Sequence, residues 1–326
     1  MRRILSIDGG GIKGAFPASF LAAVEDSIED RIADHFDLIV GTSTGGIVAL
    51  GLGLGLSATD ILRFYEDSGP KVFGGNRILR GIRRLGVSKY ENVPLRTALE
   101  DVFAEKKLGE SSKRLVIPSL NLENGEVYIY KTAHHPRLER DYREKAVDVA
   151  LATSAAPTFL PTHRSATGVP LIDGGVWANN PVGLAVVEAI GVLGWPRESL
   201  RVLSLGCTSE PLGIGRGRSR GLGLGYWATR ITELFMAAQS SSSTGTAYVL
   251  VNHDDVLRVD PRVPRGRFGL DVHREIESLR GLGHSEARNA LPKVRRMFID
   301  EGPAEAFEAY KTVTPTTSTE DSDATH

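Results

Sequence analysis

Short apolar runs that end in glycine-rich turns alternate with stretches of helical spacing along the first part of the chain. Residues 4–7 form an apolar run that ends at Asp8 and three glycines, and helical spacing follows over residues 14–28. Residues 36–40 form a second apolar run, followed by a glycine turn and a helix-like segment. Strands connected through helices usually pair in parallel, so this alternation predicts an α/β fold with a mostly parallel sheet flanked by helices.

The same periodicities predict further elements downstream. Helices are predicted over residues 95–103, 148–153, 182–193, 231–240 and 285–299, and strands over residues 115–120, 126–131 and 201–205. No internal repeat or linker is visible, so we expect one domain over residues 1–311. Residues 312–326 are rich in Ser, Thr and Asp without apolar spacing, which predicts a disordered tail.

Composition narrows the classes of function. The formal net charge of -1 gives no support for binding a nucleic-acid polymer. A single cysteine, Cys207, excludes an internal disulfide framework and is typical of a cytoplasmic protein. The N-terminal apolar stretch stops too early for a secretory signal, and residues 47–56 are too short to span a bilayer. We therefore expect a cytoplasmic protein that touches membranes only transiently, at their inner surface.

Ser43 lies in the turn Gly41-Thr42-Ser43-Thr44-Gly45, between the second apolar run and a helix-like segment. In that context a G-x-S-x-G match indicates a nucleophile, because the sharp turn exposes the serine and the helix N-terminus faces it. The same residues also suit a serine that only caps a helix after a buried strand. Ser43 is therefore a candidate nucleophile, and Gly41 and Gly45 are the small residues that the turn requires.

The glycine-rich segment after the first apolar run is compatible with two kinds of site. Residues 9–14 match the G-x-G-x-x-G pattern of a dinucleotide-binding loop. That site needs an acidic residue at the end of the second strand, where this chain has Ser43. The alternative is an oxyanion hole, because glycines let backbone N–H groups approach developing negative charge closely. Lys13 adds a positive field to such a hole or is a solvated lysine at the helix start.

A serine nucleophile needs a general base, which is usually a histidine. Eight histidines are present, and none stands in a turn motif that resembles a triad histidine. Asp173 is the alternative, because it follows the apolar residues Leu171 and Ile172 and precedes two glycines. Such a sequence often marks a plain turn in which the aspartate caps its own backbone. It also suits a carboxylate at a sheet edge, within reach of a serine.

Four blocks in this order resemble the patatin-like phospholipases, over residues 3–205. The blocks are residues 8–14, residues 41–45, Ser154-Ala155-Ala156-Pro157 with Phe159 and Pro161, and Asp173-Gly174-Gly175 followed by Asn179-Asn180-Pro181. Each block is weak alone, and together they are specific. Lys13 stands where many members carry arginine, which keeps the charge but not the bidentate geometry.

The resemblance implies a three-layer patatin-like α/β fold and a Ser–Asp dyad that hydrolyses fatty-acyl esters of membrane glycerophospholipids without a metal or cofactor. Ser43 would be the nucleophile and Asp173 the general base, with a pKa raised by partial desolvation. The oxyanion hole would be formed by Gly9, Gly10 and Gly11. The residues that would support the motifs are Asp8, Lys13, Gly14, Gly41, Gly45, Gly174 and Gly175.

Within that family, residues 3–8 and 130–135 are similar to bacterial phospholipase effectors of cyclic-oligonucleotide anti-phage signalling systems. This similarity implies activation by a cyclic dinucleotide, with oligomerisation on activation left open. The basic side chains that would contact the nucleotide or lipid are Lys131, His134, Arg137, Arg80 and Arg83. Each of them also suits an ordinary solvated surface or a strand end.

Two other classes of function remain open on sequence alone. One is a ligand-binding module whose glycine loop holds a nucleotide while Ser43 caps a helix. The other is a non-catalytic regulatory protein on a patatin-like scaffold, since a fold does not dictate an activity.

Overall fold

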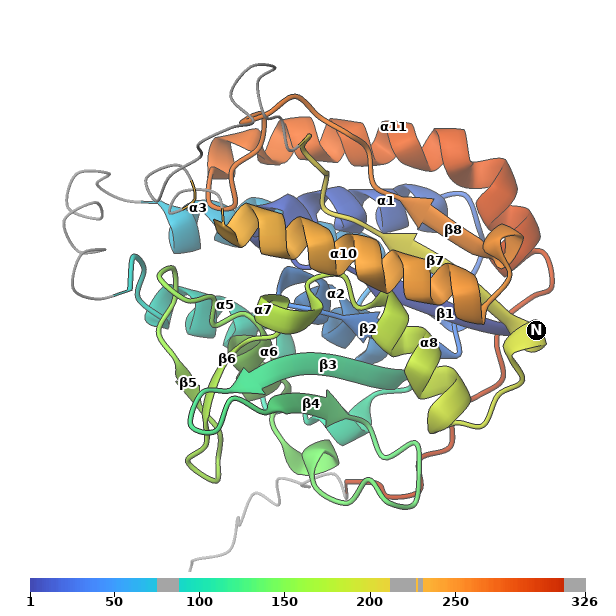
Figure 1. Cartoon of the computed structure of the whole chain (residues 1–326), viewed down its shortest axis with the longest axis horizontal. Helices are drawn as coiled ribbons and strands as arrows, with labels where there is room; N and C mark the ends of the chain where they lie inside the picture. The colour runs from blue at the N-terminus through green and yellow to red at the C-terminus, as the bar shows by residue number, and fades with distance from the viewer. Residues whose placement is uncertain (75–87, 212–226, 228–230, 314–326) are drawn as a thin grey trace, which may run out of the picture.

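One mixed β-sheet lies at the centre of the structure (Figure 1). The structure is a computed structural model that describes residues 1–74, 88–211, 227 and 231–313. The strands are β1 (Arg2–Ile7), β2 (Leu38–Gly41), β3 (Arg114–Asn121), β4 (Val127–Lys131), β5 (His163–Arg164), β6 (Pro170–Asp173), β7 (Leu200–Leu205) and β8 (Val256–Val259). Their order across the sheet is β5-β6-β3-β2-β1-β7-β8, with β4 paired to β3 beside this path. The prediction of a mostly parallel sheet is confirmed at the centre of the sheet, where β3, β2, β1, β7 and β8 are parallel neighbours.

Helices cover both faces of this sheet. They are α1 (Ala15–Glu25), α2 (Thr44–Gly53), α3 (Ala58–Phe73), α5 (Val93–Phe103), α6 (Ala146–Thr153), α7 (Gly175–Ala178), α8 (Val182–Gly191), α10 (Ile231–Leu250) and α11 (Ile276–Val294). A 3₁₀ turn, η1 (Gly11–Gly14), separates β1 from α1, and a π-turn (Arg295–Ile299) extends α11.

Alternation along β1 divides the core into two layers. Leu5 and Ile7 point into the larger core, which α1, α2, α3, α5, α6 and α11 complete. Ile4 points to the other face, where it packs with residues of α8 and α10. In Figure 1, α10 crosses the near side of the sheet and α11 runs along its upper edge. The protein therefore has the expected helix–sheet–helix layers.

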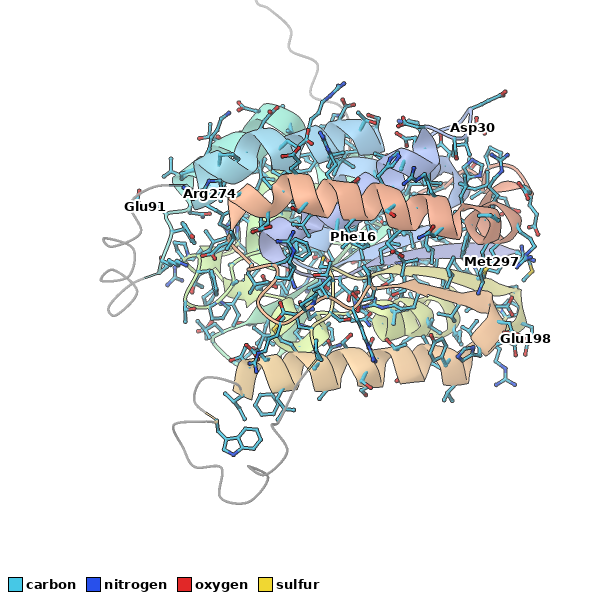
Figure 2. All side chains as sticks on the ribbon, turned by 90° about the horizontal axis from the view of Figure 1, so that it is seen from above. Phe16, Asp30, Glu91, Glu198, Arg274 and Met297 are labelled. Carbon is cyan, nitrogen blue, oxygen red and sulfur yellow. The ribbon has the colours of Figure 1, made fainter. Side chains whose placement is uncertain are left out.

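The packing of α11 on α1 shows how the larger core is closed. Phe16 of α1 is fully buried and lies beneath α11 (Figure 2). The two helices approach closely at Gly283, where an added Cβ would lie 2.5 Å from the backbone oxygen of Phe16. This contact ties the last long helix to the helix that follows the glycine loop.

Three predicted elements need correction. The helix predicted from residue 14 begins with η1 and becomes α-helical at Ala15. The helix predicted over residues 231–240 continues to Leu250, and Ser240, Ser243 and Thr244 of this helix bond to Asn180. The helix predicted from residue 285 begins at Ile276. The expectation of a tail over residues 312–326 lies outside the described residues from residue 314 onward.

Candidate active site

The turn between β2 and α2 holds Ser43 in an unusual backbone conformation. Its φ of 54° and ψ of -122° lie in a region that non-glycine residues avoid, and such strain costs on the order of 1–3 kcal/mol. Gly41 and Gly45 make this turn possible. An added Cβ on Gly41 would lie 2.1 Å from the oxygen of Gly45, and one on Gly45 would lie 2.3 Å from the oxygen of Ile7. The turn is therefore built around the position of one serine side chain.

Ser43 and Asp173 meet at the carboxyl end of the parallel strands. The Ser43 hydroxyl donates to Oδ2 of Asp173 at 2.7 Å, and both residues are buried. β6 brings the carboxylate there, since it runs antiparallel to β3 with Asp173 opposite Ser119. The hydroxyl of Thr153 accepts from the Ser43 N–H at 3.0 Å and donates to the oxygen of Pro118 at 2.6 Å, which fixes the turn to β3.

The Asp173 carboxylate has few partners. Its Oδ1 accepts from the N–H of Gly175 at 2.6 Å, and its Oδ2 accepts from Ser43. Burial raises the pKa of Asp173 to about 6, and the two hydrogen bonds lower it only in part. A carboxylate with this pKa is ionised at neutral pH and is a better proton acceptor than an exposed aspartate.

The glycine loop lies beside Ser43. A Cβ added to Gly9 would be 3.2 Å from the Ser43 Cβ. The Gly9 N–H donates to the oxygen of Asn179 at 2.9 Å, so it is already occupied. The N–H groups of Gly10 and Gly11 donate to no residue that the structure describes. Of the three N–H groups predicted to form an oxyanion hole, those of Gly10 and Gly11 therefore remain as candidate donors.

The remaining motif residues surround this loop and the dyad. Asp8 is buried and forms an ion pair with Arg258, and Lys13 Nζ donates to the oxygen of Thr208 at 3.3 Å. Gly14 lies against Thr44 and Tyr65, and Gly174 lies against the oxygen of Pro118. The four sequence blocks thus converge at one end of the sheet.

Two of the basic residues predicted to contact a nucleotide or lipid, Lys131 and His134, bond to Glu188 of α8. Lys131 Nζ is 2.6 Å from one oxygen of Glu188, and His134 Nε2 is 2.9 Å from the other. His134 is buried, and its Nδ1 bonds to the Thr132 hydroxyl. Lys131 pairs with Val116 of β3, which in turn pairs with Val40 of β2. In this cluster Lys131 and His134 compensate the buried carboxylate of Glu188, and their contact with a nucleotide or lipid stays a prediction.

Arg137 is exposed at the surface beyond β4. Arg80 and Arg83 lie outside the described residues.

Sequence reasoning assigned no role in the site to Thr153, Asn179 or Arg258. Asn179 stands four residues after Gly175 in the fourth block, and Thr153 precedes the Ser-Ala-Ala-Pro block, so their positions were a usable signal. Arg258 lies 250 residues from its partner Asp8, and no local pattern announces the pair.

Among the described residues, no group of three or more His, Cys, Asp or Glu side chains is arranged to hold a metal ion. Within the same ranges, no helix is both long and apolar enough to cross a bilayer.

Comparison with known proteins agrees with this geometry. The family model described as patatin-like phospholipase matches residues 5–186. A "cGAMP-activated phospholipase" of Pseudomonas aeruginosa is 36% identical over 73% of this chain and 72% of its own length. A protein of the same name from Vibrio cholerae is 33% identical over 80% of this chain and 82% of its own length. "Patatin-like protein 2" of Arabidopsis thaliana is 36% identical over 57% of this chain and 52% of its own length.

The family model covers more than half of the chain, and its range contains both members of the serine–aspartate pair. The two bacterial relatives are named phospholipases and the plant relative is named a patatin-like protein, each at an identity above 30%. The chain belongs to the patatin-like phospholipase family.

Proposed function

We propose that Ser43 and Asp173 are the catalytic dyad with which this phospholipase cleaves fatty-acyl esters of membrane glycerophospholipids. The observation that carries the proposal is the 2.7 Å hydrogen bond from the Ser43 hydroxyl to Asp173, beside a glycine loop whose Gly10 and Gly11 N–H groups donate to no described residue. These are the nucleophile, base and oxyanion donors that acyl transfer needs.

The acylation step follows from this arrangement. Asp173 takes the hydroxyl proton while the Ser43 oxygen attacks the ester carbonyl carbon, and the carbonyl electron pair moves onto oxygen. The N–H groups of Gly10 and Gly11 donate to that oxyanion. When the carbon–oxygen bond to the glycerol breaks, Asp173 returns the proton to the departing lysophospholipid, and the acyl group stays on Ser43.

Deacylation uses the same groups in reverse. Water gives a proton to Asp173 and attacks the acyl carbonyl, and the second oxyanion occupies the same site. The fatty acid leaves, and the proton returns from Asp173 to the Ser43 oxygen. Each step transfers one proton to or from the same carboxylate, so the pKa of Asp173 controls both.

The lipid reaches the dyad from a membrane surface. Exposed apolar side chains, here called the apolar rim, come from segments around the site, namely Val176, Ile231, Leu234, Phe235, Leu270 and Val272. α7 packs on α10, Glu233 of α10 pairs with Arg265 at 3.1 Å, and the oxygen of Leu270 accepts from the Ile12 N–H. These contacts keep the rim together at the dyad end of the protein and favour peripheral binding to lipid.

Activity is raised by a cyclic dinucleotide of the cGAMP kind. Support comes from the two bacterial relatives, whose names state activation by cGAMP and which align with most of this chain. Lys131 and His134 are bonded to Glu188, so a nucleotide that contacts them would have to compete with this carboxylate. The nucleotide acts as a regulator and not as a reactant, because the dyad chemistry is complete without it.

The test is fatty-acid release from vesicles of phosphatidylethanolamine and phosphatidylglycerol, measured by mass spectrometry with and without cGAMP. The wild type should release fatty acid, and more so with cGAMP. Ser43→Ala and Asp173→Asn should release at least about a thousandfold less. Ser241→Ala, an exposed serine of α10, is the matched control and should behave as wild type. Release by Ser43→Ala at the wild-type rate would refute the dyad, and identical release with and without cGAMP would refute the activation.

A further inference from the structure

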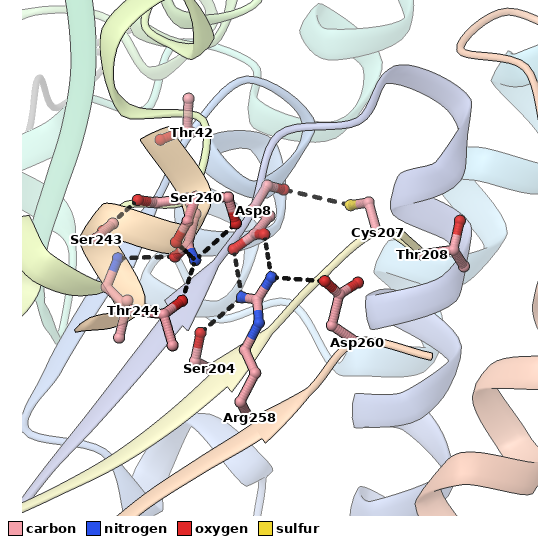
Figure 3. Close-up of polar contacts among 12 residues, drawn as sticks. Asp8, Thr42, Ser204, Cys207, Thr208, Ser240, Ser243, Thr244, Arg258 and Asp260 are labelled. Carbon is pink, nitrogen blue, oxygen red and sulfur yellow. Dashed lines mark hydrogen bonds and ion pairs between the residues drawn. The ribbon is translucent and has the colours of Figure 1, made fainter. Parts of the chain in front are cut away.

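A buried ion pair anchors the start of the glycine loop. Asp8 is the last residue before the three glycines, and its side chain is buried. Arg258 of β8 donates from Nη1 to one carboxylate oxygen at 2.8 Å and from Nη2 to the other at 2.6 Å (Figure 3). This bidentate arrangement fixes both the position and the plane of the carboxylate.

The sheet register explains how Arg258 reaches Asp8. Ser6 of β1, Ser204 of β7 and Arg258 of β8 stand side by side across three parallel strands. Asp8 follows Ser6 by two residues and therefore lies on the same face. The guanidinium crosses β7, where it donates to the Ser204 hydroxyl at 2.8 Å, and it also donates to Asp260 at 3.0 Å. Figure 3 shows Arg258 at the centre of these contacts.

Other contacts hold the glycine loop on both sides of the Gly10 and Gly11 N–H groups, which donate to no described residue. Before them, the Gly9 N–H is bound to Asn179. After them, the Ile12 N–H donates to the oxygen of Leu270 at 2.8 Å. Gly10 lies against Cys207, so close that a Cβ would be 2.5 Å from the cysteine Cβ. The N–H groups of Gly10 and Gly11 thus lie between residues whose backbone is held by hydrogen bonds. Among the residues that hold the loop, Asp8 is charged.

We propose that Arg258 is a positioning residue for the oxyanion hole, which through Asp8 aims the N–H groups of Gly10 and Gly11 at the oxyanion formed on the substrate. The proposal rests on the function proposed for Ser43 and Asp173. Arg258 lies outside residues 5–186, the range matched by the family model, so β8 contributes to the site from beyond that range.

The physical consequence of losing the guanidinium is specific. Burial raises the pKa of Asp8 to about 6 even with Arg258 beside it. Without that cation the carboxylate would be protonated at neutral pH, or it would draw in water and move the loop. Donors of an oxyanion hole act at 2.7–3.1 Å, and a shift of about 1 Å is enough to reduce rates about a hundredfold.

Arg258→Lys keeps the charge and loses the bidentate geometry, whereas Asp8→Asn keeps the size and loses the charge. Both variants would be compared with the control Arg201→Lys. Arg201 lies in β7, away from the glycine loop, and pairs with Glu301 at 2.6 Å. The substrate is p-nitrophenyl butyrate, a soluble ester that needs no membrane. A fatty-acyl trifluoromethyl ketone serves as the probe of the hole, because its adduct with Ser43 carries an oxyanion.

Positioning predicts a kcat reduced about 10- to 100-fold in Arg258→Lys and Asp8→Asn, with KM within about twofold of wild type. The inhibition constant of the ketone should rise by the same factor as kcat/KM falls, and the urea midpoint of Arg258→Lys should stay near that of Arg201→Lys. A folded Arg258→Lys or Asp8→Asn variant with unchanged kcat and ketone affinity would overturn the proposal.

Two further outcomes are informative. If either variant loses stability but the folded fraction keeps the wild-type kcat and ketone affinity, the ion pair is only structural and the proposal fails. If Ser43→Ala retains p-nitrophenyl butyrate hydrolysis, the proposed dyad fails instead, irrespective of the result for Arg258.

Discussion

The Asp173 carboxylate is expected to destabilise the folded protein at the pH where it works. Its pKa rises from 3.8 to about 6 on folding, because burial disfavours the charged form. A group whose folded pKa is raised lowers stability as pH increases through the interval between the two values. At 1.36 kcal/mol for each pH unit, the full effect is about 3 kcal/mol above pH 6 and nearly vanishes below pH 3.8.

Asp173→Asn removes this charge from the buried site and keeps the shape of the side chain. We expect the variant to be more stable than wild type by about 3 kcal/mol at pH 8, and by about half as much at pH 5. Urea unfolding at the two pH values measures the difference, and hydrolysis of p-nitrophenyl butyrate should be lost at both. Asp254→Asn, an exposed aspartate before β8, is the control and should show no such gain. A destabilised Asp173→Asn at pH 8, or a gain that does not shrink at pH 5, would refute the reasoning.

Three further predictions concern the base, the turn and the rim. The kcat/KM for p-nitrophenyl butyrate should fall about tenfold per pH unit below pH 6, since Asp173 must be ionised, and a flat profile from pH 5 to 8 would contradict this assignment. Gly45→Ala should abolish reaction of Ser43 with a fluorophosphonate, because its Cβ meets the Ile7 oxygen, whereas Gly191→Ala, with no heavy atom within 4 Å of the new Cβ, should react normally. Phe235→Ser, at a side chain 65% exposed, should sediment less with phosphatidylglycerol vesicles than Val249→Ser at the other end of α10, and equal sedimentation would exclude the rim.

Elements buried on both faces could be predicted well from the sequence. The apolar residues that became β1, β2, β3 and β7 are continuous runs, because strands in the middle of a parallel sheet contact helices on both sides. The turn at Ser43 was also legible, since it needs small residues at fixed offsets from the serine. These features depend on local chemistry.

Elements that depend on distant partners could not be predicted. β8 was missed because Arg258 interrupts its short apolar pattern, and the carboxylate that compensates this arginine comes from residue 8. α10 was predicted to end near residue 240, because the serines after it look like a loop until Asn180 is known to lie against them. The start of α11 was missed because Gly283 weakens the helical signal, while it is that glycine which allows close contact with α1.

The basic contacts predicted at Lys131 and His134 also involve a distant partner. Lys131 and His134 look available along the sequence, but Glu188 of α8 occupies both. A buried carboxylate recruits whatever cations the fold brings near it, and only the tertiary structure identifies them.

In the proposed mechanism one serine oxygen, activated by one carboxylate, carries the acyl group during turnover. Mass spectrometry of protein quenched in acid during p-nitrophenyl butyrate hydrolysis tests it directly, through the mass of the peptide that contains Ser43. We predict a butyryl adduct on Ser43 in the wild type, and none in Ser43→Ala or Asp173→Asn. An adduct on another residue, or the same adduct at full rate in Asp173→Asn, would contradict the proposed Ser43–Asp173 mechanism.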